Sequence, residues 1–373
     1  MENAATPGLT VEYFHSREVH PDKQRDFDGL KISALGAGTY LGGADEMTDK
    51  LYEQSLFKAA QNGVNFFDTA INYRCMRSEK VIQKVLSELE RNGVKRGQIV
   101  IATKGGYIPC EGSPDHFDDY LRTHFLDPGI ISSSEIVGGC HCISPAFLEM
   151  QISLSLRNLG VECIDLYYLH NPETQLQEVE EAEFYHRLTA AFRLFEKKVQ
   201  EGKIARYGIA TWNGLRQKPG QKTTLQLSKV LASAQEAGGV NHHFRAVQMP
   251  YNLVMLEAVK IKNQIKEPEA KTVLQTLAEM HLAFMVSSPL MQSHAMSLPQ
   301  RVFDRLPKEE SSVLQSLQFL SSTPTACALF AGMKKIEHLQ ENRKLLFLPN
   351  WPKEQWEKTL SAISGSPPPQ QSI

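Results

Sequence analysis

Short runs of apolar, β-branched residues alternate with amphipathic helical stretches from about residue 31 to residue 347 of this 373-residue chain. Such alternation is typical of βα units, and successive βα units build a parallel sheet. Eight runs can be counted, at residues 32–35, 65–68, 99–103, 164–169, 207–210, 246–249, 283–287 and 327–330. Eight consecutive units predict an α/β fold, a (β/α)8 TIM barrel whose functional side chains lie at the carboxyl ends of the strands.

Helix-end signals follow the same spacing. Glycines that suit helix ends and serines that suit helix starts stand at Gly63, Gly160 and Gly202, and at Ser78 and Ser144, the last followed by Pro145. The segment GAGTYLGG at residues 36–43 resembles the glycine-rich turn of an open, doubly wound sheet. Leu41 takes the place of its third glycine, so we expect the closed barrel instead, within a single domain of residues 1–373.

Two segments depart from the βα period. The stretch from residue 105 to residue 144 follows the third strand and is rich in Gly, Ser, Asp, His and Pro, so we expect a loop insertion that is a functional lid or is disordered. Residues 361–373 are rich in Pro and Ser, and we expect this C-terminal tail to be unpacked. We also expect an N-terminal hairpin segment before the first barrel strand.

The charge balance limits the classes of partner. Forty Lys and Arg against 42 Asp and Glu give a net charge of -2, which provides no field of one sign for nucleic acid or anionic lipid. The first residues lack the apolar core of a signal peptide, and no run approaches the roughly 18 apolar residues of a membrane span. We therefore expect a cytoplasmic protein without nucleic-acid or membrane partners, whose six cysteines are free thiols.

Four titratable side chains stand at the ends of the second, third and fourth strands. FFDTAINYR supplies Asp68 and Tyr73, IVIATKGG supplies Lys104, and DLYYLHNP supplies His170. A barrel brings neighbouring strand ends together, so these residues are expected to meet. Each also has a purely structural interpretation: a helix cap for Asp68, an exposed aromatic for Tyr73, a solvated strand end for Lys104 and a turn histidine for His170.

The order and placement of these motifs resemble the aldo-keto reductase superfamily, from about residue 31 to residue 346. That family carries an Asp, Tyr, Lys and His tetrad on these strand ends. Further similar segments are EGKIARYGIATWN at 201–213, AVQMPYNL at 246–253, SSPL at 287–290 and AGMKKIEHLQEN at 331–342. The resemblance implies an oxidoreductase that transfers a hydride between NADP(H) and a small carbonyl or alcohol, such as an aldehyde, a ketone or a sugar.

The resemblance also implies the roles of the tetrad, with Tyr73 as the general acid–base. A phenol has an ordinary pKa of about 10 and is a poor acid unless its anion is stabilised. We expect the Lys104 ammonium to lower the pKa of Tyr73, and Asp68 to pair with Lys104 and hold it in place. His170 is expected to hydrogen-bond the substrate oxygen.

Matches to the family's nicotinamide contacts lie on the later strands. Gln248 matches the glutamine that hydrogen-bonds the nicotinamide carboxamide, and Thr211 can supply one hydrogen bond where the family has a Ser-Asn pair. Ser287 stands where many relatives place an aromatic that stacks on the nicotinamide, so stacking would have to come from another residue such as Trp212.

Matches to the adenosine contacts lie in the last unit. Glu341 and Asn342 match the pair that reads the adenine, and we expect them in the first turn of the closing helix. Lys334 and Lys335 lie where the family places groups around the 2′-phosphate, which would favour NADP(H), with a solvated turn as the alternative. His338 stands where many relatives carry Arg, which keeps NAD(H) possible.

The insertion is expected to lie over the barrel mouth and to control substrate choice. Its cysteines and histidines, including the Cys-His-Cys run at 140–142, lack a standard zinc spacing, and no metal is expected. The alternative function is an NADP-binding regulatory or channel-associated subunit with little turnover. A phosphate-binding isomerase would need a glycine loop after the last strands, which SSPLMQS does not provide. The natural substrate and the oligomeric state stay open.

Overall fold

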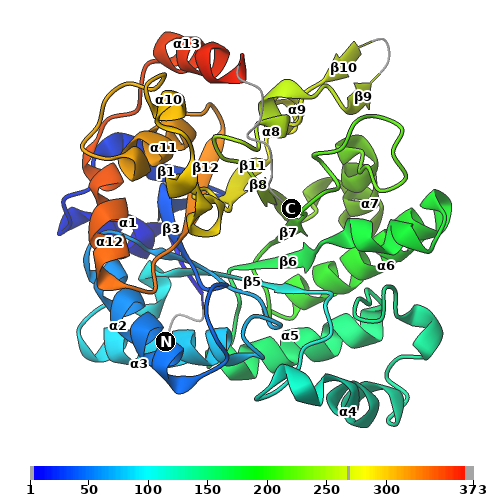
Figure 1. The fold of residues 1–373 in the computed structure, drawn as a ribbon. Coiled ribbons are helices and arrows are strands. Elements are labelled where there is room, and N and C mark those ends of the chain that lie inside the picture. Colours follow the sequence, from blue (N-terminus) through cyan, green and yellow to red (C-terminus); the bar gives the residue numbers. More distant parts are fainter. Residues whose placement is uncertain (1–3, 267–268, 366–373) are drawn as a thin grey trace.

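The computed structural model describes residues 4–266 and 269–365. Eight parallel strands form a closed barrel in the order β11-β12-β3-β4-β5-β6-β7-β8. The strands are β3 (Leu35–Gly38), β4 (Phe66–Asp68), β5 (Val100–Gly105), β6 (Leu166–His170), β7 (Tyr207–Ala210), β8 (Phe244–Pro250), β11 (Ala283–Ser287) and β12 (Ala326–Gly332). The predicted (β/α)8 barrel is therefore confirmed (Figure 1).

Helices follow the strands and surround the barrel (Figure 1). They are α2 (Glu46–Gln61), α3 (Arg77–Arg91), α5 (Pro145–Leu159), α6 (Glu181–Gln200), α7 (Leu227–Gly238), α8 (Glu257–Lys260), α9 (Val273–Glu279), α10 (Gln300–Phe303), α11 (Ser312–Ser321) and α12 (Ile336–Asn342). Helix α5 begins after Ser144 with Pro145 in its first turn and ends at the left-handed Gly160, as predicted. Helix α3 begins at Arg77, one residue before the predicted start at Ser78.

The first predicted strand, residues 32–35, has the wrong boundaries. Leu30–Ser33 forms β2, which pairs antiparallel with β1 (Gln24–Phe27), and the barrel strand β3 begins only at Leu35. Phe27 of this hairpin stacks on Phe66, the first residue of β4, with ring centroids 6.3 Å apart. The expected N-terminal hairpin therefore exists and covers the amino-terminal end of the barrel, preceded by helix α1 (Pro7–His15).

The insertion of residues 105–144 is folded. It contains α4 (Phe117–Leu121), and its buried Tyr120, Phe125 and Ile131 form an apolar cluster with Phe147 of α5. Figure 1 shows α4 on the outer side of α5, away from the centre of the barrel. The expectations of disorder and of a lid across the barrel mouth are therefore wrong for most of this segment.

The chain after the barrel continues in a helix. Helix α13 (Lys353–Ser364) buries Trp356 and Ile363, and the Trp356 Nε1–H donates to Thr323 Oγ1 at 3.0 Å. The prediction of an unpacked tail from residue 361 is wrong for residues 361–364, and residues 366–373 lie outside the described part. A hairpin of β9 (Gln264–Lys266) and β10 (Glu269–Lys271) projects outward beside α8 and α9 (Figure 1).

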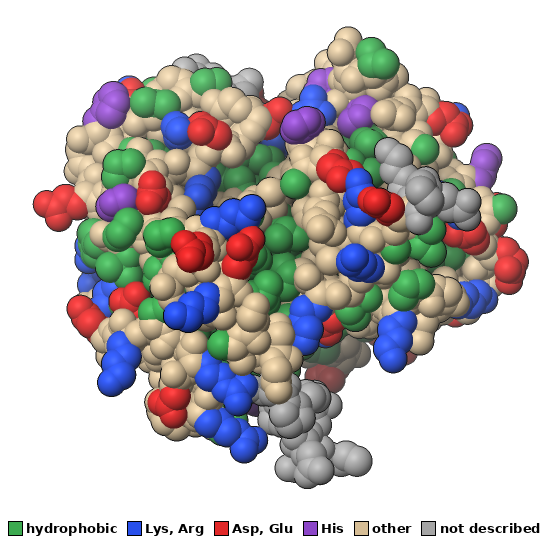
Figure 2. Space-filling model, turned by 90° about the horizontal axis from the view of Figure 1, so that it is seen from above, with side chains coloured by type: hydrophobic (Ala, Val, Ile, Leu, Met, Phe, Trp, Pro, Cys, Tyr) green, Lys and Arg blue, Asp and Glu red, His purple; other side chains and the backbone are tan. Residues whose placement is uncertain are grey.

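The surface carries both signs of charge. Figure 2 shows Lys and Arg side chains interspersed with Asp and Glu over one face of the molecule. Within the described ranges, no helix has the length and apolar content needed to cross a membrane. All six cysteines are free thiols, as expected.

Candidate active site

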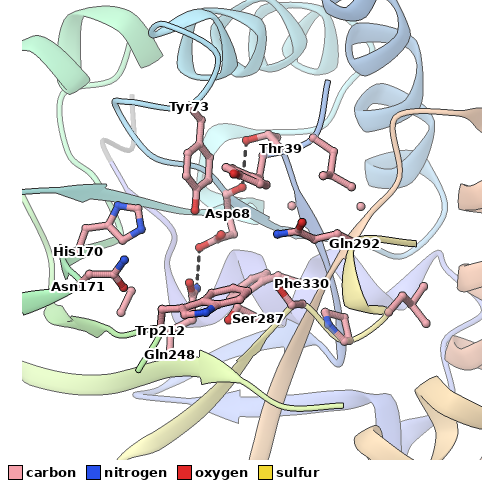
Figure 3. A pocket seen from close by; sticks show the side chains of 18 of the residues that line it. Thr39, Asp68, Tyr73, His170, Asn171, Trp212, Gln248, Ser287, Gln292 and Phe330 are labelled. Atoms are coloured by element: carbon pink, nitrogen blue, oxygen red, sulfur yellow. Dashed lines mark hydrogen bonds between the residues drawn. The ribbon is translucent and has the colours of Figure 1, made fainter. Parts of the chain in front are cut away.

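A cavity of about 490 Å³ opens at the carboxyl ends of the barrel strands. Its wall includes most of the predicted site residues, namely Asp68, Tyr73, His170, Thr211, Gln248, Ser287, Glu341 and Asn342. Figure 3 shows the Tyr73, Asp68, His170 and Trp212 side chains directed into this space from different loops and strands. The structure therefore brings together residues that are far apart in the sequence.

A buried ion pair lies at the base of the cavity. Lys104, near the end of β5, places its Nζ 2.6 Å from Asp68 Oδ2 at the end of β4, and also donates to the Thr69 carbonyl at 2.8 Å. The two side chains are only 1% and 7% exposed. Burial lowers the pKa of Lys104 and raises the pKa of Asp68, while each partner's charge opposes that shift. The predicted Asp68–Lys104 pair is thus confirmed as a contact.

Tyr73 lies in the loop between β4 and α3, and this loop has an unusual backbone. The next three residues, 74–76, all have positive φ although none is glycine. Arg74 forms an ion pair with Asp49 of α2, and its Nε–H donates to the Gly43 carbonyl at 2.8 Å. The buried Arg74 side chain therefore anchors the turn that presents Tyr73 to the cavity.

The protonation of Tyr73 differs from the expectation. Lys104 Nζ lies 4.9 Å from the centroid of the Tyr73 ring. Burial nevertheless raises the pKa of Tyr73 well above its ordinary value, and the Asp68 carboxylate raises it further. The net shift is opposite to the expected lowering by Lys104, because burial and, to a smaller extent, the Asp68 carboxylate both favour the neutral phenol. Tyr73 therefore stays protonated in this cavity.

His170 stands at the end of β6 between two aromatic rings. Its ring centroid lies 5.9 Å from that of Tyr73 and 5.0 Å from that of Tyr107, both in edge-to-face contact. Burial lowers the pKa of His170 well below its ordinary value, and the positive charge of Lys104 adds to this effect. The imidazole is therefore neutral, and its Nδ1 has no hydrogen-bond partner among the described residues.

The residues predicted to hold the nicotinamide lie on β8, on β11 and in the loop directly after β7. Gln248 donates from Nε2 to Asp68 Oδ1 at 2.8 Å, so this amide is tied to the ion pair (Figure 3). Thr211 Oγ1 accepts the N–H of Gly214 at 2.9 Å and thereby shapes the loop after β7. The Trp212 indole in this loop faces the cavity, as does Ser287 at the end of β11 (Figure 3).

The residues predicted to read the adenine lie in α12. Glu341 and Asn342 occupy the last turn of this helix rather than the first, so the predicted placement is wrong although both side chains line the cavity. Asn342 is 2% exposed, and its Nδ2 has no partner within the part of the chain that the structure describes. Lys334 and Lys335 precede α12 and do not line the cavity.

The family model for the aldo/keto reductases matches residues 34–345. The chain belongs to the aldo/keto reductase family. It is 25% identical over 320 residues to the uncharacterized oxidoreductase YqkF of Bacillus subtilis, a match that spans 84% of this chain and 87% of that protein. A probable aldo-keto reductase 1 of Glycine max is 31% identical over 186 residues, 49% of this chain and 42% of that one.

Solved structures of aldo-keto reductases share the fold. The holo form of aldo-keto reductase AKR11C1 from Bacillus halodurans superposes with a TM-score of 0.63 at 18% identity, over 91% of this chain and 95% of that one. An aldo/keto reductase from Klebsiella pneumoniae, in complex with NADP and acetate, superposes with a TM-score of 0.60 at 18% identity, over 94% and 98% of the two chains. At these identities the likeness establishes the barrel fold alone.

Several cavity residues of this aldo/keto reductase were missed in the sequence. They include Thr39 and Tyr40 after β3, Tyr107 after β5, Asn171 after His170, and Gln292 after β11. All of them lie in the segments that follow barrel strands, which is the position that could have indicated them. Beneath the wall, the buried Glu173 Oε1 accepts the N–H groups of residues 212, 213 and 214 at 3.0, 2.9 and 3.2 Å.

A metal site is also not found in the aldo/keto reductase cavity. Across residues 4–266 and 269–365, no three His, Cys, Asp or Glu side chains are grouped so that they could hold a metal ion. Of the cysteines and histidines of the insertion, His141 and Cys142 are buried, and His124 stacks on Tyr120 with ring centroids 4.1 Å apart.

Proposed function

We propose that this protein is an NADP(H)-linked oxidoreductase that interconverts a small carbonyl compound and the corresponding alcohol, with Tyr73 as the general acid–base. The observation that carries the proposal is the convergence of Tyr73, His170 and the buried Lys104–Asp68 pair at one cavity. NADP(H), when bound, supplies or accepts the hydride. The Klebsiella pneumoniae relatives with NADP and with NADPH support this choice of cofactor.

The lining of the cavity fits such a cofactor. It extends from the tetrad to α12, where the buried Nδ2 of Asn342 has no partner among the described residues and could donate to an adenine nitrogen. Thr211, Gln248 and Ser287 would hold the nicotinamide end, with Trp212 as the ring that stacks on it. Glu341 would contact the adenosine end together with Asn342.

We also propose that the ammonium groups of Lys334 and Lys335 lie near the adenosine 2′-phosphate of the bound cofactor. A Cβ on Gly42 would lie 3.2 Å from Lys334 Nζ, so this ammonium sits against the loop after β3. No hydrogen bond or ion pair joins the side-chain ammonium of Lys334 or of Lys335 to another described residue. A phosphate could therefore be met by an ammonium that is not already paired.

The proton step follows from the protonation states in the cavity. Burial and the Asp68 carboxylate keep the Tyr73 hydroxyl protonated, so Tyr73 can donate this proton to a carbonyl oxygen that becomes an alkoxide. The neutral His170 can donate one further hydrogen bond to the same oxygen and fix its direction. We assign Lys104 and Asp68 an electrostatic role: the buried pair determines the charge environment of the Tyr73 hydroxyl.

The proposal is tested by measuring binding of NADPH and of NADH through quenching of tryptophan fluorescence, together with oxidation of each cofactor in the presence of a panel of aldehydes, ketones and sugars. We expect NADPH to bind more tightly than NADH and to be consumed with at least one substrate. Binding without consumption across the panel would favour the regulatory alternative. Failure to bind either cofactor would contradict the proposed function.

A further inference from the structure

The folded insertion contacts the main chain of a site residue and contributes little to the wall of the cavity. Of its described residues only Tyr107 lines the cavity, so the insertion offers little surface to a substrate. The insertion instead contacts the main chain of His170 through His141, which is fully buried. His141 Nε2 lies 2.8 Å from the His170 carbonyl oxygen.

The two ends of the insertion hold His141 in place. Tyr107 and His141 face each other in an antiparallel bridge. The Cys142 N–H donates to the Gly106 carbonyl, and the Ile108 N–H donates to the Cys140 carbonyl, both at 2.8 Å. His141 therefore has the backbone order of a short β ladder although it belongs to no strand of the barrel.

The hydrogen bonds around His141 form a chain with a single possible direction. Arg187 can only donate, and its Nη1 lies 3.0 Å from Gln175 Oε1, which fixes the orientation of that amide. Gln175 Nε2 therefore donates to His141 Nδ1 at 3.0 Å. With Nδ1 as the acceptor, the ring proton lies on Nε2 and is donated to the His170 carbonyl.

The charge state of His141 agrees with this direction. Burial lowers the pKa of His141 to about 4, so the ring is neutral at physiological pH and carries a single N–H. A charged ring would present an N–H at Nδ1 toward the Gln175 amide, which is itself a donor.

Gly106 leaves the space that this contact needs. Its φ is +130°, in the region that favours glycine, and a Cβ there would lie 3.0 Å from His141 Nε2 and 3.1 Å from the His170 carbonyl oxygen. The close approach of the insertion to the end of β6 therefore depends on the absence of a side chain at this position.

The same insertion also contacts the imidazole itself. The Tyr107 ring lies edge-on against both His141, at 4.9 Å between centroids, and His170, at 5.0 Å. Asn171 adopts a left-handed conformation with φ 44° and donates from Nδ2 to Tyr107 Oη at 3.1 Å. His170 is thus held through its carbonyl by His141 and on one edge of its ring by Tyr107.

We propose that His141 is a positioning residue for the reaction. Through His141 the insertion fixes the main chain of His170. It thereby sets the direction of the hydrogen bond that the His170 imidazole offers to the substrate oxygen. The inference rests on the proposed function for its effect on turnover. The placement of His170 itself can be measured without turnover, so a failure of the two proposals can be told apart.

The test compares His141→Gln with His141→Asn, which differ by one methylene. The Gln amide nitrogen can reach the position of Nε2 and keep the donor to the His170 carbonyl, whereas the shorter Asn cannot. His124→Phe in the same insertion is the matched control, because His124 is exposed and does not touch His170. We expect kcat to fall about tenfold or more in His141→Asn, with an unchanged Kd for NADPH, and to be largely restored in His141→Gln.

The readout that does not need turnover is the NMR spectrum of protein labelled in its histidines, with the His170 signals assigned through His170→Asn. We expect these signals to shift or broaden in His141→Asn and to keep their wild-type positions in His141→Gln and His124→Phe. Wild-type His170 signals in His141→Asn would overturn the proposal, as would equal kcat values in the Asn and Gln variants.

A second variant keeps the proposal testable if His141→Asn does not fold. Gln175→Leu removes the amide that orients His141 and leaves the insertion itself unchanged. We expect the His170 signals to shift in this variant and kcat to fall by about threefold or more, since one supporting hydrogen bond is lost. His170 signals and kcat equal to those of the wild type would overturn the proposed role of His141.

Discussion

Replacing Lys104 by Met should show how much the buried ion pair contributes to folding. Met has a similar length but carries no charge. In the wild type the Lys104 ammonium is buried against Asp68 at 2.6 Å and against the Thr69 carbonyl at 2.8 Å. Removing one member of a buried pair leaves the other charge without compensation and costs about 3–5 kcal/mol. We therefore expect the free energy of unfolding at neutral pH to fall by that amount.

The loss in Lys104→Met should depend on pH in a defined direction. Burial raises the pKa of Asp68, and Lys104 is the largest influence that lowers it. Without Lys104 the folded-state pKa of this carboxyl rises further above its unfolded value. A group with a raised pKa stabilises the fold at low pH and loses that contribution as the pH rises through the folded-state pKa. The deficit relative to the wild type should thus be smaller at about pH 5 than at about pH 8.

The assay is urea unfolding followed by tryptophan fluorescence, with Asp68→Asn/Lys104→Met as the matched variant. The Asn oxygen can still accept the Gln248 amide, and in the double variant neither position 68 nor position 104 carries a charge. We expect it to regain at least half of the lost unfolding free energy while staying inactive, because breaking a buried pair costs more than replacing it. A deficit of Lys104→Met below about 1 kcal/mol, or a double variant as unstable as the single one, would refute the reasoning.

Two further predictions concern the cofactor and the proton. Asn342→Leu should raise the Kd for NADPH about threefold to tenfold, which is the equivalent of one hydrogen bond. The melting temperature should not fall, because the Asn342 Nδ2 has no partner among the described residues. An unchanged Kd in a fluorescence titration would exclude this residue from the cofactor site. Because burial and Asp68 raise the pKa of Tyr73, the phenol stays protonated and kcat/KM for reduction should be flat from about pH 6 to pH 9. A fall in that profile near neutral pH would show that the phenol ionises earlier.

The sequence predicted the barrel correctly but not where its first strand begins. β3 reads Leu-Gly-Ala-Gly, and glycines argue against a strand on propensity alone. Only the structure shows that Phe330 fills the interior space, since a Cβ on Gly36 would lie 2.5 Å from the Phe330 ring. The preceding β-branched residue, Ile32, belongs to the hairpin, so an apolar run could not reveal which of two sheets it joins.

The tail prediction failed for a different reason. Trp356 and Ile363 lie seven positions apart in α13 and show the helical spacing of a buried face. The Pro- and Ser-rich composition of the residues that follow led to the prediction of an unpacked tail despite this helical spacing. For the insertion, composition again indicated a loop, whereas Tyr120, Phe125 and Ile131 supply enough apolar surface for a small core of their own.

The site was predictable where strand ends alone determine it. Asp68, Tyr73 and His170 meet at one cavity because β4 and β6 end at the same side of the barrel. The pKa of Tyr73 was not predictable, since its sign depends on burial and on the distance to a carboxylate. The contact between His141 and His170 was also not predictable, because it arises from the tertiary folding of the insertion.

The most direct test of the proposed role of Tyr73 is Tyr73→Phe, which removes one hydroxyl and leaves the ring in the cavity. We expect an unchanged Kd for NADPH and an unchanged melting temperature, with kcat reduced about 10²- to 10⁴-fold, the usual contribution of a general acid. Tyr120→Phe, a tyrosine in the core of the insertion, serves as the control and should keep wild-type turnover. A Tyr73→Phe variant that reduces the carbonyl at the wild-type rate would contradict the central claim that Tyr73 supplies the proton.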